Sequence, residues 1–394
     1  MQMKAELPSG EEQVPTHGRI KILYIQPGTS SFAGIERVVD TICSALSEKY
    51  AADFEIDVLY TSTHKNRPAG KQSYNTIDRI AHNRRELVSI LRSVFKSKDY
   101  GLIVVPQIEP TVICMMACLG IRRNFAMHLH GNPRLEPSHL KAKILFFLMR
   151  IYFIKRLSYV FGTSPKQLES FKAMFASKTP QYWLPNPVRK FDFPKSKPVD
   201  EANCVTFVNV GRFSYQKGQD ILLDAFAELY KARKNVKLKV VGYGAGEAEL
   251  REQIRRLELE DVVSIEHHPD NPQSALSTSD VYISTSRWEG WSLAICEALR
   301  FGLPVISTDC EFGPSDILVD RRLGLLVPVS GGDELVKAMI YYCDNLQDEL
   351  SHAEYRQSFI DSFDTERVVD VHADALRVAA RHRQYALPWS AGML

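Results

Sequence analysis

The sequence predicts an α/β protein built from two doubly wound parallel-sheet domains, and three observations lead to that prediction. Short apolar runs alternate with amphipathic, helix-like segments from Arg19 almost to the end of the chain, the order expected of repeated βαβ units. A proline-bearing boundary at 184–188, followed by Pro194 and Pro198, separates two such series. The length of 394 residues is enough for two domains, each with a core of its own.

The composition is that of an ordinary soluble globular protein, with 45% hydrophobic and 24% charged residues. Seven cysteines, an odd number without regular pairing, fit a reducing compartment better than a disulfide framework. Cys114 and Cys118 lie four apart in an apolar run and are expected to be buried thiols. No histidine pair completes a zinc pattern, so no metal site is predicted.

The two ends of the chain are expected to lie outside the folded domains. The first 17 residues are polar and lack the basic start and apolar core of a signal peptide, which predicts a disordered lead-in. Residues 333–383 are predicted to be helical and the last eleven or so to be frayed. No stretch reaches the roughly 18 uncharged apolar residues of a membrane-spanning helix.

Charge divides unevenly between the two halves. Residues 1–190 contain 27 Lys+Arg and 15 Asp+Glu, whereas the remainder contains 22 and 32. A basic half in a nearly neutral chain predicts contact with something anionic, either a membrane surface or a phosphorylated substrate. Nucleic acid is not favoured as a partner, because no aromatic-and-basic binding motif is present.

The first domain is predicted to begin with a strand at Ile20–Ile25, a loop containing Gly28 and Gly34, and a helix from Ile35 to about Leu46. The two glycines would let the backbone approach a ligand at the strand's carboxyl end. The loop does not match G-x-G-x-x-G, so an ordinary βα turn and a binding loop both remain open. Further strands are predicted at 54–60, 102–105, 125–129 and 159–161.

Two histidines mark the strand at 125–129. Period-two alternation places His128 and His130 on one face of the sheet, with His130 beside Gly131 at the strand end. A histidine at a strand's carboxyl end is a site candidate in an open α/β sheet. His128 is expected to be a hydrogen-bonded core residue.

An apolar stretch with basic flanks lies between Leu135 and Leu157. Its most apolar part, 144–154, is interrupted by one arginine and has two cations on either side, Lys141, Lys143, Lys155 and Arg156. It fits either a buried crossover helix or a helix lying on a membrane surface, where basic side chains would reach anionic head groups.

The second domain is predicted to open with a strand at 204–210. A loop from Gly211 to Gly218 follows, in which Arg212 and Lys217 precede a helix at 220–230. Two cations beside a helix start suit a diphosphate, although surface charge alone would also explain them.

The next strand, 236–241, runs into Gly242 and Gly244. These resemble half of a dinucleotide fingerprint, but Glu247 stands where its third glycine should fall. A nicotinamide-dependent oxidoreductase is therefore a poor fit. A strand at 262–265 then leads to His267 and His268.

The stretch 285–297 contains two carboxylates, Glu289 and Glu297. A buried strand at 281–285 precedes Glu289, Gly290 permits a tight turn, and a helix is expected to follow directly. That helix would place Glu297 two turns in, about 12 Å further along the axis at about 1.5 Å per residue. Alternatively, Glu289 caps the helix and Glu297 is a solvated surface residue. Later elements are predicted as a strand at 304–308, a turn at 313–316 and a last strand at 324–328.

Four segments of the second half together resemble the retaining glycosyltransferases of family 4, which have the GT-B fold. They are Gly211-Arg212…Lys217-Gly218, Gly242-Tyr-Gly244, Ser286-Arg-Trp-Glu289-Gly…Glu297-Ala and Gly313-Pro…Asp316. The resemblance covers nearly the whole chain, is looser in the first half, and is closest to bacterial enzymes that build lipopolysaccharide, capsule and other surface glycans. It implies two Rossmann-like domains facing each other across a cleft.

This resemblance also implies domain boundaries. The first domain would be 18–188, on the acceptor side, with a carboxyl-terminal helix at about 365–394 packing back on it. The second, 189–364, would bind a nucleotide-sugar. Three residues depart from the family pattern: Ala33, Asp316 in place of a more usual glutamate, and the large Trp291.

Roles are implied for individual residues by the same resemblance. Arg212 and Lys217 would neutralise the diphosphate without a metal, Glu297 would hold the ribose, and Glu289 would hold the transferred sugar. The implied catalytic residues are Glu289, His130, Arg212 and Lys217. The implied donor-binding residues are Gly28, Gly34, Gly211, Arg212, Lys217, Gly242, Gly244, His267, Glu289, Gly290, Trp291, Ser292, Leu293 and Glu297.

The resulting hypothesis is an enzyme that moves a hexose or N-acetylhexosamine from a nucleotide-diphosphate sugar to a lipid-linked or oligosaccharide acceptor. A UDP-sugar is favoured as the donor, with a GDP-sugar as the alternative. The enzyme would need no cofactor and would work in the cytoplasm, on the inner face of the cytoplasmic membrane. Two alternatives are a soluble enzyme that makes a free disaccharide or glycoside, and a nucleotide-binding protein without catalysis.

Overall fold

The structure, a computed structural model, describes residues 18–26, 28, 29, 32, 34–65, 67, 70–191, 204–267 and 271–381. The predicted lead-in, the predicted frayed end, the proline-bearing run after residue 191, Ala33 and His268 lie outside the described residues. The chain forms two compact units. The first ends at Pro187 and resumes at Thr365, and the second is Val188–Asp364.

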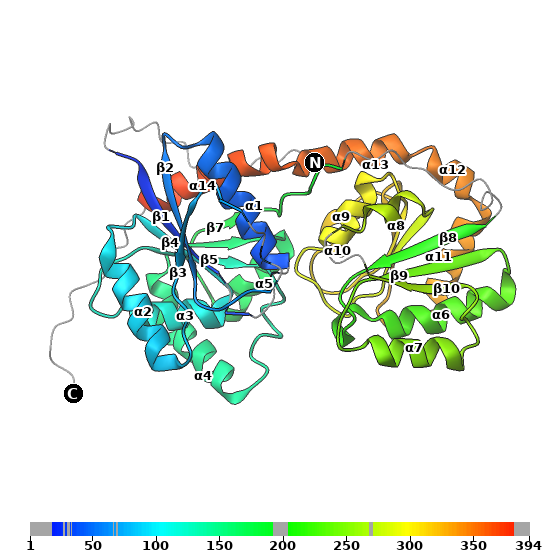
Figure 1. Cartoon of the computed structure of the whole chain (residues 1–394), viewed down its shortest axis with the longest axis horizontal. Coiled ribbons are helices and arrows are strands. Elements are labelled where there is room, and N and C mark those ends of the chain that lie inside the picture. The colour runs from blue at the N-terminus through cyan, green and yellow to red at the C-terminus, as the bar shows by residue number, and fades with distance from the viewer. Residues whose placement is uncertain are drawn as a thin grey trace. The chain divides into compact units, whose positions relative to one another are not determined.

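The first unit is built on a seven-stranded parallel sheet with the order β3-β2-β1-β4-β5-β6-β7 (Figure 1). The chain moves outward from β1 to β3 and then crosses to the other side of β1, which makes the sheet doubly wound. The point where the order reverses, between β1 and β4, is where open α/β sheets commonly bind ligands. The strands are β1 Ile20–Ile25, β2 Phe54–Tyr60, β3 Asn75–Asp78, β4 Leu102–Pro106, β5 Phe125–Leu129, β6 Tyr159–Gly162 and β7 Gln181–Trp183.

Helices cover this sheet, and one of them comes from the far end of the chain. The helix α14 returns to the first unit, where Asp370 accepts from Lys49 Nζ at 2.5 Å and from the Tyr50 hydroxyl at 2.7 Å (Figure 1). The helical elements are α1 Gly34–Lys49, α2 Arg84–Ser97, α3 Ile108–Ala117, α4 Leu140–Leu148, η1 Met149–Phe153, η2 Ile154–Arg156, α5 Pro165–Phe175 and α14 Thr365–Arg381.

Two strands, β3 and β7, are not predicted by the sequence pattern. Both are edge strands, four and three residues long, and none of their residues is buried. An edge strand has one neighbour to pair with and little apolar surface to bury, so it leaves no apolar run in the sequence.

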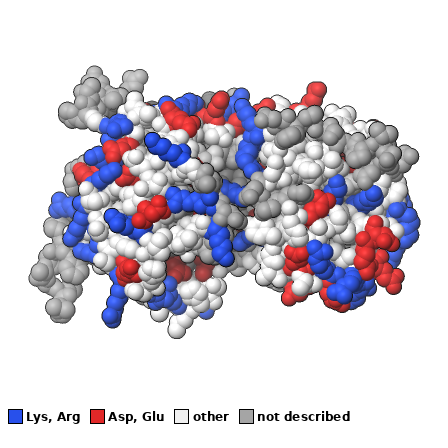
Figure 2. All heavy atoms as spheres, in the orientation of Figure 1, with Lys and Arg blue, Asp and Glu red and all other residues white. Residues whose placement is uncertain are grey.

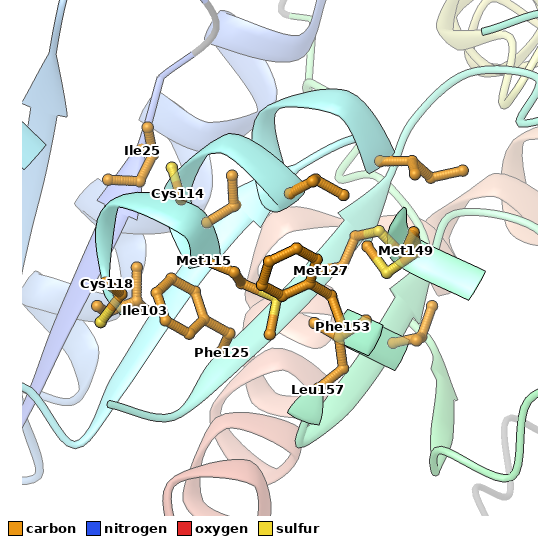
Figure 3. Packing of buried hydrophobic residues seen from close by; sticks show 14 of the residues in the cluster. Ile25, Ile103, Cys114, Met115, Cys118, Phe125, Met127, Met149, Phe153 and Leu157 are labelled. Carbon is orange, nitrogen blue, oxygen red and sulfur yellow. The ribbon is translucent and has the colours of Figure 1, made fainter. Parts of the chain in front are cut away.

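Central strands of the first unit are buried on both faces, as expected of a parallel sheet covered by helices. Figure 3 shows α3 and the segment after α4 packing on this sheet, with Met149 and Phe153 directed toward Met127. Cys114 and Cys118 are buried thiols in this core, as predicted, and burial raises the pKa of Cys118 to about 11.

The second unit has a six-stranded parallel sheet with the order β10-β9-β8-β11-β12-β13, and all six strands were predicted. The strands are β8 Val205–Val210, β9 Val236–Val241, β10 Val263–Glu266, β11 Val281–Ser284, β12 Val305–Thr308 and β13 Gly324–Val327. The helical elements are η4 Tyr215–Lys217, α6 Gln219–Ala232, α7 Glu247–Arg256, α8 Gln273–Ser277, α9 Leu293–Arg300, α10 Pro314–Ile317, α11 Gly332–Asp344, α12 Leu346–Leu350, α13 Ala353–Ile360 and η5 Asp361–Phe363.

The predicted fold class, two parallel-sheet α/β domains, is therefore confirmed. Within the described ranges, no helix is long and apolar enough to cross a membrane.

Candidate functional site

The loop after β8 is held tightly against the loop after β11 in the second unit. Gly218 has a φ of +63°, and a Cβ there would lie 2.1 Å from the carbonyl oxygen of Thr285. The Thr285 hydroxyl in turn donates to the Gly218 carbonyl at 2.8 Å. Only glycine permits both the left-handed backbone and this close approach, so Lys217 is brought beside the segment that contains Glu289.

Lys217 and Glu289 form an ion pair at the centre of this arrangement. Lys217 Nζ lies 2.5 Å from Glu289 Oε1, and the Ser286 hydroxyl donates to the same oxygen at 2.7 Å. The side chains are only 19% and 7% exposed, which makes their charges interact more strongly than on an open surface. The alternative of a helix-capping Glu289 is wrong, because the residue before α9 is Ser292.

The helix after Glu289 starts later than predicted. α9 begins at Leu293, so Glu297 lies just over one turn into it rather than two. The expected 12 Å rise along one helix axis is therefore wrong, because 289–292 are not helical. The backbone of Gly290 packs against Gly313, because a Cβ added to Gly313 would lie 3.1 Å from the Gly290 carbonyl oxygen. This contact shapes the loop.

The start of α9 leaves backbone amides that are suited to an anion. The first amides of a helix have no acceptor within the helix and point toward its N-terminal end. Ser292 is buried at the N-cap, and within the described part of the chain its side chain accepts no capping hydrogen bond. The loop thus keeps the predicted amide groups at Ser292 and Leu293 on the strand-end side of the sheet.

Glu297 has a partner for which the sequence shows no signal. Both Nε and Nη2 of Arg189 donate to Glu297 Oε1, at 3.2 and 2.8 Å, and Glu297 is 8% exposed. The alternative of a solvated Glu297 is therefore wrong. Burial first, and then the charges of Glu289 and Glu297, raise the pKa of Tyr282, so both carboxylates lie near that phenol.

Backbone packs directly on backbone where β8 and β9 end. A Cβ on Gly242 would lie 1.9 Å from the Gly211 carbonyl oxygen, and one on Gly244 would lie 2.4 Å from that of Phe213. The strand pairing continues into these loops, because Gly211 N–H donates to the Val241 carbonyl at 2.9 Å. The predicted glycines at 211, 242 and 244 are thus brought together.

Arg212 and His267 lie outside the Lys217–Glu289 pair. The Arg212 guanidinium is exposed, with a long contact of 3.5 Å to Gln216 Oε1. His267 is 2.8 Å from Glu247 and lies near the ring of Phe213, at 6.4 Å between centroids. Its bond to His267 is the main cause of the lowered pKa of Glu247.

Trp291 is a core residue of the second unit. It is 5% exposed, and its ring lies 5.3 Å from that of Phe363. In the predicted donor site, the buried Trp291 ring would therefore anchor the loop that contains Gly290 and Ser292.

In the first unit, His130 lies at the end of β5 in a cluster of buried histidines. The rings of His128 and His130 are 4.0 Å apart, and His372 of α14 is 5.9 Å from His128. Within the described residues neither ring nitrogen of His130 has a hydrogen-bond partner. Burial, and then His372, lowers the pKa of His130 to about 3, so its ring is neutral at neutral pH.

Two residues beside His130 have no sequence signal. Gln107, at the end of β4, has a φ of +66°, which is rare for a residue with a side chain. With its side-chain amide turned so that both neighbours are satisfied, the amide oxygen accepts from Gly131 N–H at 3.2 Å and the amide nitrogen donates to Glu136 Oε1 at 2.9 Å. Burial raises the pKa of Glu136 to about 8. Backbone strain of this kind is often found at functional sites. Here the strained residue, Gln107, links the end of β4 to the loop that contains His130.

The first βα loop is only partly described. Gly28 is exposed and Gly34 begins α1, and a Cβ on either would meet nothing within 4 Å. Glu36 in the first turn of α1 is buried and accepts from the Thr29 hydroxyl at 2.5 Å, an interaction for which the sequence has no motif. Whether this loop binds a ligand therefore stays a prediction.

The cluster of buried histidines is expected to lower the free energy of unfolding in acid. His130 and His372 have folded pKa values of about 3 and about 4, below the ordinary 6.5 of the unfolded chain. The unfolded state therefore takes up protons first as the pH falls below 6.5, and each histidine destabilises the fold by on the order of 2 kcal/mol at pH 5. Thermal unfolding midpoints from pH 7 to pH 5 measure this loss.

A His372→Gln variant isolates the effect, because its midpoint should depend less on pH than that of the wild type. Glu136, with its raised pKa, acts in the opposite direction over the same range and is common to both proteins. Parallel curves for the two proteins would contradict the prediction.

Comparison with known proteins shows which family the second unit is similar to. Residues 189–359 match the family described as Glycosyl transferases group 1. An uncharacterized glycosyltransferase of Methanocaldococcus jannaschii is 27% identical over 260 residues, which are 63% of this chain and 61% of that protein. The lipopolysaccharide 1,6-galactosyltransferase of Escherichia coli is 32% identical over 137 residues, 34% of this chain and 38% of that protein. The chain thus spans less than two thirds of the length of either relative.

A solved structure supports the fold over most of the chain. An Anabaena protein in complex with UDP and glucose superposes with a TM-score of 0.74 at 19% identity, covering 91% of this chain and 100% of that one. At this level of identity the likeness shows the fold, which is GT-B with two parallel-sheet α/β domains.

Proposed function

We propose that this chain, which has the GT-B fold and carries a Glycosyl transferases group 1 domain at residues 189–359, is a retaining glycosyltransferase of family 4. It would transfer a hexose or N-acetylhexosamine from a nucleotide-diphosphate sugar to a lipid-linked or oligosaccharide acceptor of a bacterial surface glycan. The observation that carries the proposal is the buried Lys217–Glu289 ion pair, set between two strand-end loops.

The chemistry of these groups suits departure of a diphosphate. When the bond to the sugar breaks, negative charge develops on the leaving phosphate, and preorganised cations and amide groups stabilise it. Lys217 supplies a fixed cation, Arg212 an exposed one, and Ser292 and Leu293 supply amides at the start of α9. Two side-chain cations would provide the positive charge that a metal ion provides in other transferases.

Glu289 and Glu297 would divide the rest of the donor between them. Glu289 has its Oε1 occupied by Lys217 and Ser286, which orients its carboxylate toward the transferred sugar in this proposal. Glu297, oriented by Arg189, would accept from the ribose hydroxyls. His130 stays a predicted catalytic residue of the first unit, with a neutral ring suited to accept a hydrogen bond from a sugar hydroxyl.

Similarity to other proteins supports the choice of UDP as the nucleotide and of a surface glycan as the acceptor in this proposal. The Anabaena protein of the same fold was solved with UDP and glucose, and the E. coli relative acts on lipopolysaccharide. The proposal also includes a peripheral contact with the anionic inner face of the cytoplasmic membrane, because residues 1–190 have an excess of Lys+Arg.

A panel of nucleotide-diphosphate sugars in a thermal-shift assay tests the donor site. A donor at about 100 times its dissociation constant should stabilise the protein by about 2.7 kcal/mol. Slow release of sugar from that donor without acceptor would distinguish an enzyme from a nucleotide-binding protein that has lost catalysis. No shift with any UDP- or GDP-sugar would contradict the proposal.

Replacement of either cation is expected to slow transfer. Charge-assisted contacts of about 1.5 to 3 kcal/mol each predict that Arg212→Ala or Lys217→Ala lowers kcat/KM on the order of 10- to 100-fold. Lys231→Ala is a matched control, because Lys231 is an exposed cation of α6 paired with Glu228. Near-normal turnover in both site variants would remove the phosphate role from these residues.

A further inference from the structure

The outward face of the helix α4 and the turn η1 is apolar although it is exposed. Leu140, Ile144, Phe147 and Ile151 are 74%, 53%, 60% and 52% exposed. Their spacing of four, three and four residues places them in one row along a helix. We name these four residues the apolar strip.

The opposite face of the same segment is also apolar, and it is the face that the fold uses. Leu145, Phe146, Met149 and Phe153 are buried in the core of the first unit, and Figure 3 shows the last two packed among its side chains. Core packing therefore requires apolar residues on one side only. The strip has no role in that core, and exposed apolar rows of this kind mark interaction sites.

Along the sequence, the segment that holds the strip carries charge of a single sign, and Glu109 of α3 balances one of its cations, Lys141, at 2.6 Å. Residues 137–168 contain six Lys+Arg and no Asp or Glu. Lys143, Arg150 and Lys155 are exposed within the segment, between or just beyond the residues of the strip. In Figure 2, white, uncharged atoms at the lower edge of the first unit, where α4 lies in Figure 1, are bordered by blue atoms and, further from the edge, by red ones.

We propose that the apolar strip docks on an anionic lipid surface, with its four side chains at the boundary between head groups and acyl chains and with Lys143, Arg150 and Lys155 against lipid phosphates. An apolar row bordered by cations is the pattern of helices that lie in the plane of a membrane. Long basic side chains can extend from such a row to the head groups.

A second copy of the chain is a less suitable partner. A two-fold symmetric contact through the strip would bring the same cations of both copies close together, with no carboxylate between residues 137 and 168 to balance them. Anionic lipid supplies that balance. The inference rests on the proposed function only in that a lipid-linked acceptor would give this docking a purpose; the docking itself needs neither donor nor acceptor.

Flotation of the full chain with vesicles tests the docking. We expect binding to phosphatidylcholine vesicles containing a third phosphatidylglycerol, and binding at least tenfold weaker to phosphatidylcholine alone, since each cation near an anionic surface contributes roughly fivefold. An Ile144→Gln/Phe147→Gln variant should bind the anionic vesicles at least tenfold more weakly. A Lys143→Glu/Lys155→Glu variant should lose binding and its dependence on salt.

Ile80→Gln is the matched control, because Ile80 is an exposed apolar residue of the same unit in a different segment, and it should bind as the wild type does. The strip side chains are exposed, so thermal midpoints should stay unchanged, as should the thermal shift with a nucleotide diphosphate. A failure of the proposed function would appear in that nucleotide shift and leave flotation intact.

Equal flotation of the Ile144→Gln/Phe147→Gln variant and the wild type would overturn the inference. So would equal binding to neutral and anionic vesicles. The strip would instead serve self-association if light scattering showed that the wild type is a dimer, that the Ile144→Gln/Phe147→Gln variant is a monomer, and if the wild type did not bind vesicles.

Discussion

Replacing Glu289 by alanine is expected to abolish sugar transfer while leaving the binding of a free nucleotide diphosphate largely intact. The Glu289 side chain is 7% exposed and held by Lys217 and Ser286, so its carboxylate is oriented before substrate arrives. Loss of one preorganised electrostatic group at a reacting centre lowers kcat on the order of 10³-fold. Transfer assays give kcat, and calorimetry with the diphosphate gives Kd.

Two further variants separate charge from packing. Glu289→Gln keeps an oxygen that can accept from Ser286 but removes the charge, so it should be nearly as inactive as Glu289→Ala if the charge acts on the sugar. Removal of Glu289 also leaves Lys217 as a mostly buried cation without this partner, which lowers stability. Thermal midpoints must therefore accompany the kinetics. A Kd that weakens as much as kcat falls would assign Glu289 to the diphosphate rather than to the sugar.

Gly242→Ala is expected to destabilise the second unit strongly. The new Cβ would lie 1.9 Å from the Gly211 carbonyl oxygen, and neither backbone can move without breaking the pairing between β8 and β9. Overpacking against backbone costs about 3 kcal/mol or more. For a unit of this size that corresponds to a midpoint lower by about 6 to 12 °C. Donor binding should weaken with it, because the same contact positions the loop of Arg212 and Lys217.

Gly332→Ala is the matched control, because a Cβ on Gly332, the first residue of α11, would meet nothing within 4 Å. Its midpoint should lie within a few degrees of the wild type. Midpoints for both variants close to the wild type would show that the Gly211–Gly242 contact relaxes easily.

Much of the fold could be predicted because its central strands are buried on both faces. Continuous apolar runs such as 102–105 and 281–283 are required by that burial and are visible in the sequence. The edge strands β3 and β7 could not be predicted, because edge positions do not impose such a run. The sequence pattern predicts too early a start for α9, because loop geometry set by Gly290 and Gly313 leaves no periodic signal.

The candidate site divides in the same way. Residues on strand-end loops, such as Lys217 and Glu289, could be selected because loop glycines and strand ends are local features of the sequence. Their pairing, and that of Arg189 with Glu297 across 108 positions of sequence, depends on side-chain packing. Gln107 and Glu136 beside His130 belong to this second class.

The sequence by itself determined that the protein is a two-domain α/β protein, because burial imposes apolar periodicity on every central strand and helix. It also determined which glycines and charged residues lie at strand ends. Only the tertiary structure decided which charges pair and which helix faces stay exposed. An ion pair such as Lys217–Glu289, and the exposure of Phe147, depend on atoms brought together from separate parts of the chain, and no local pattern encodes those distances.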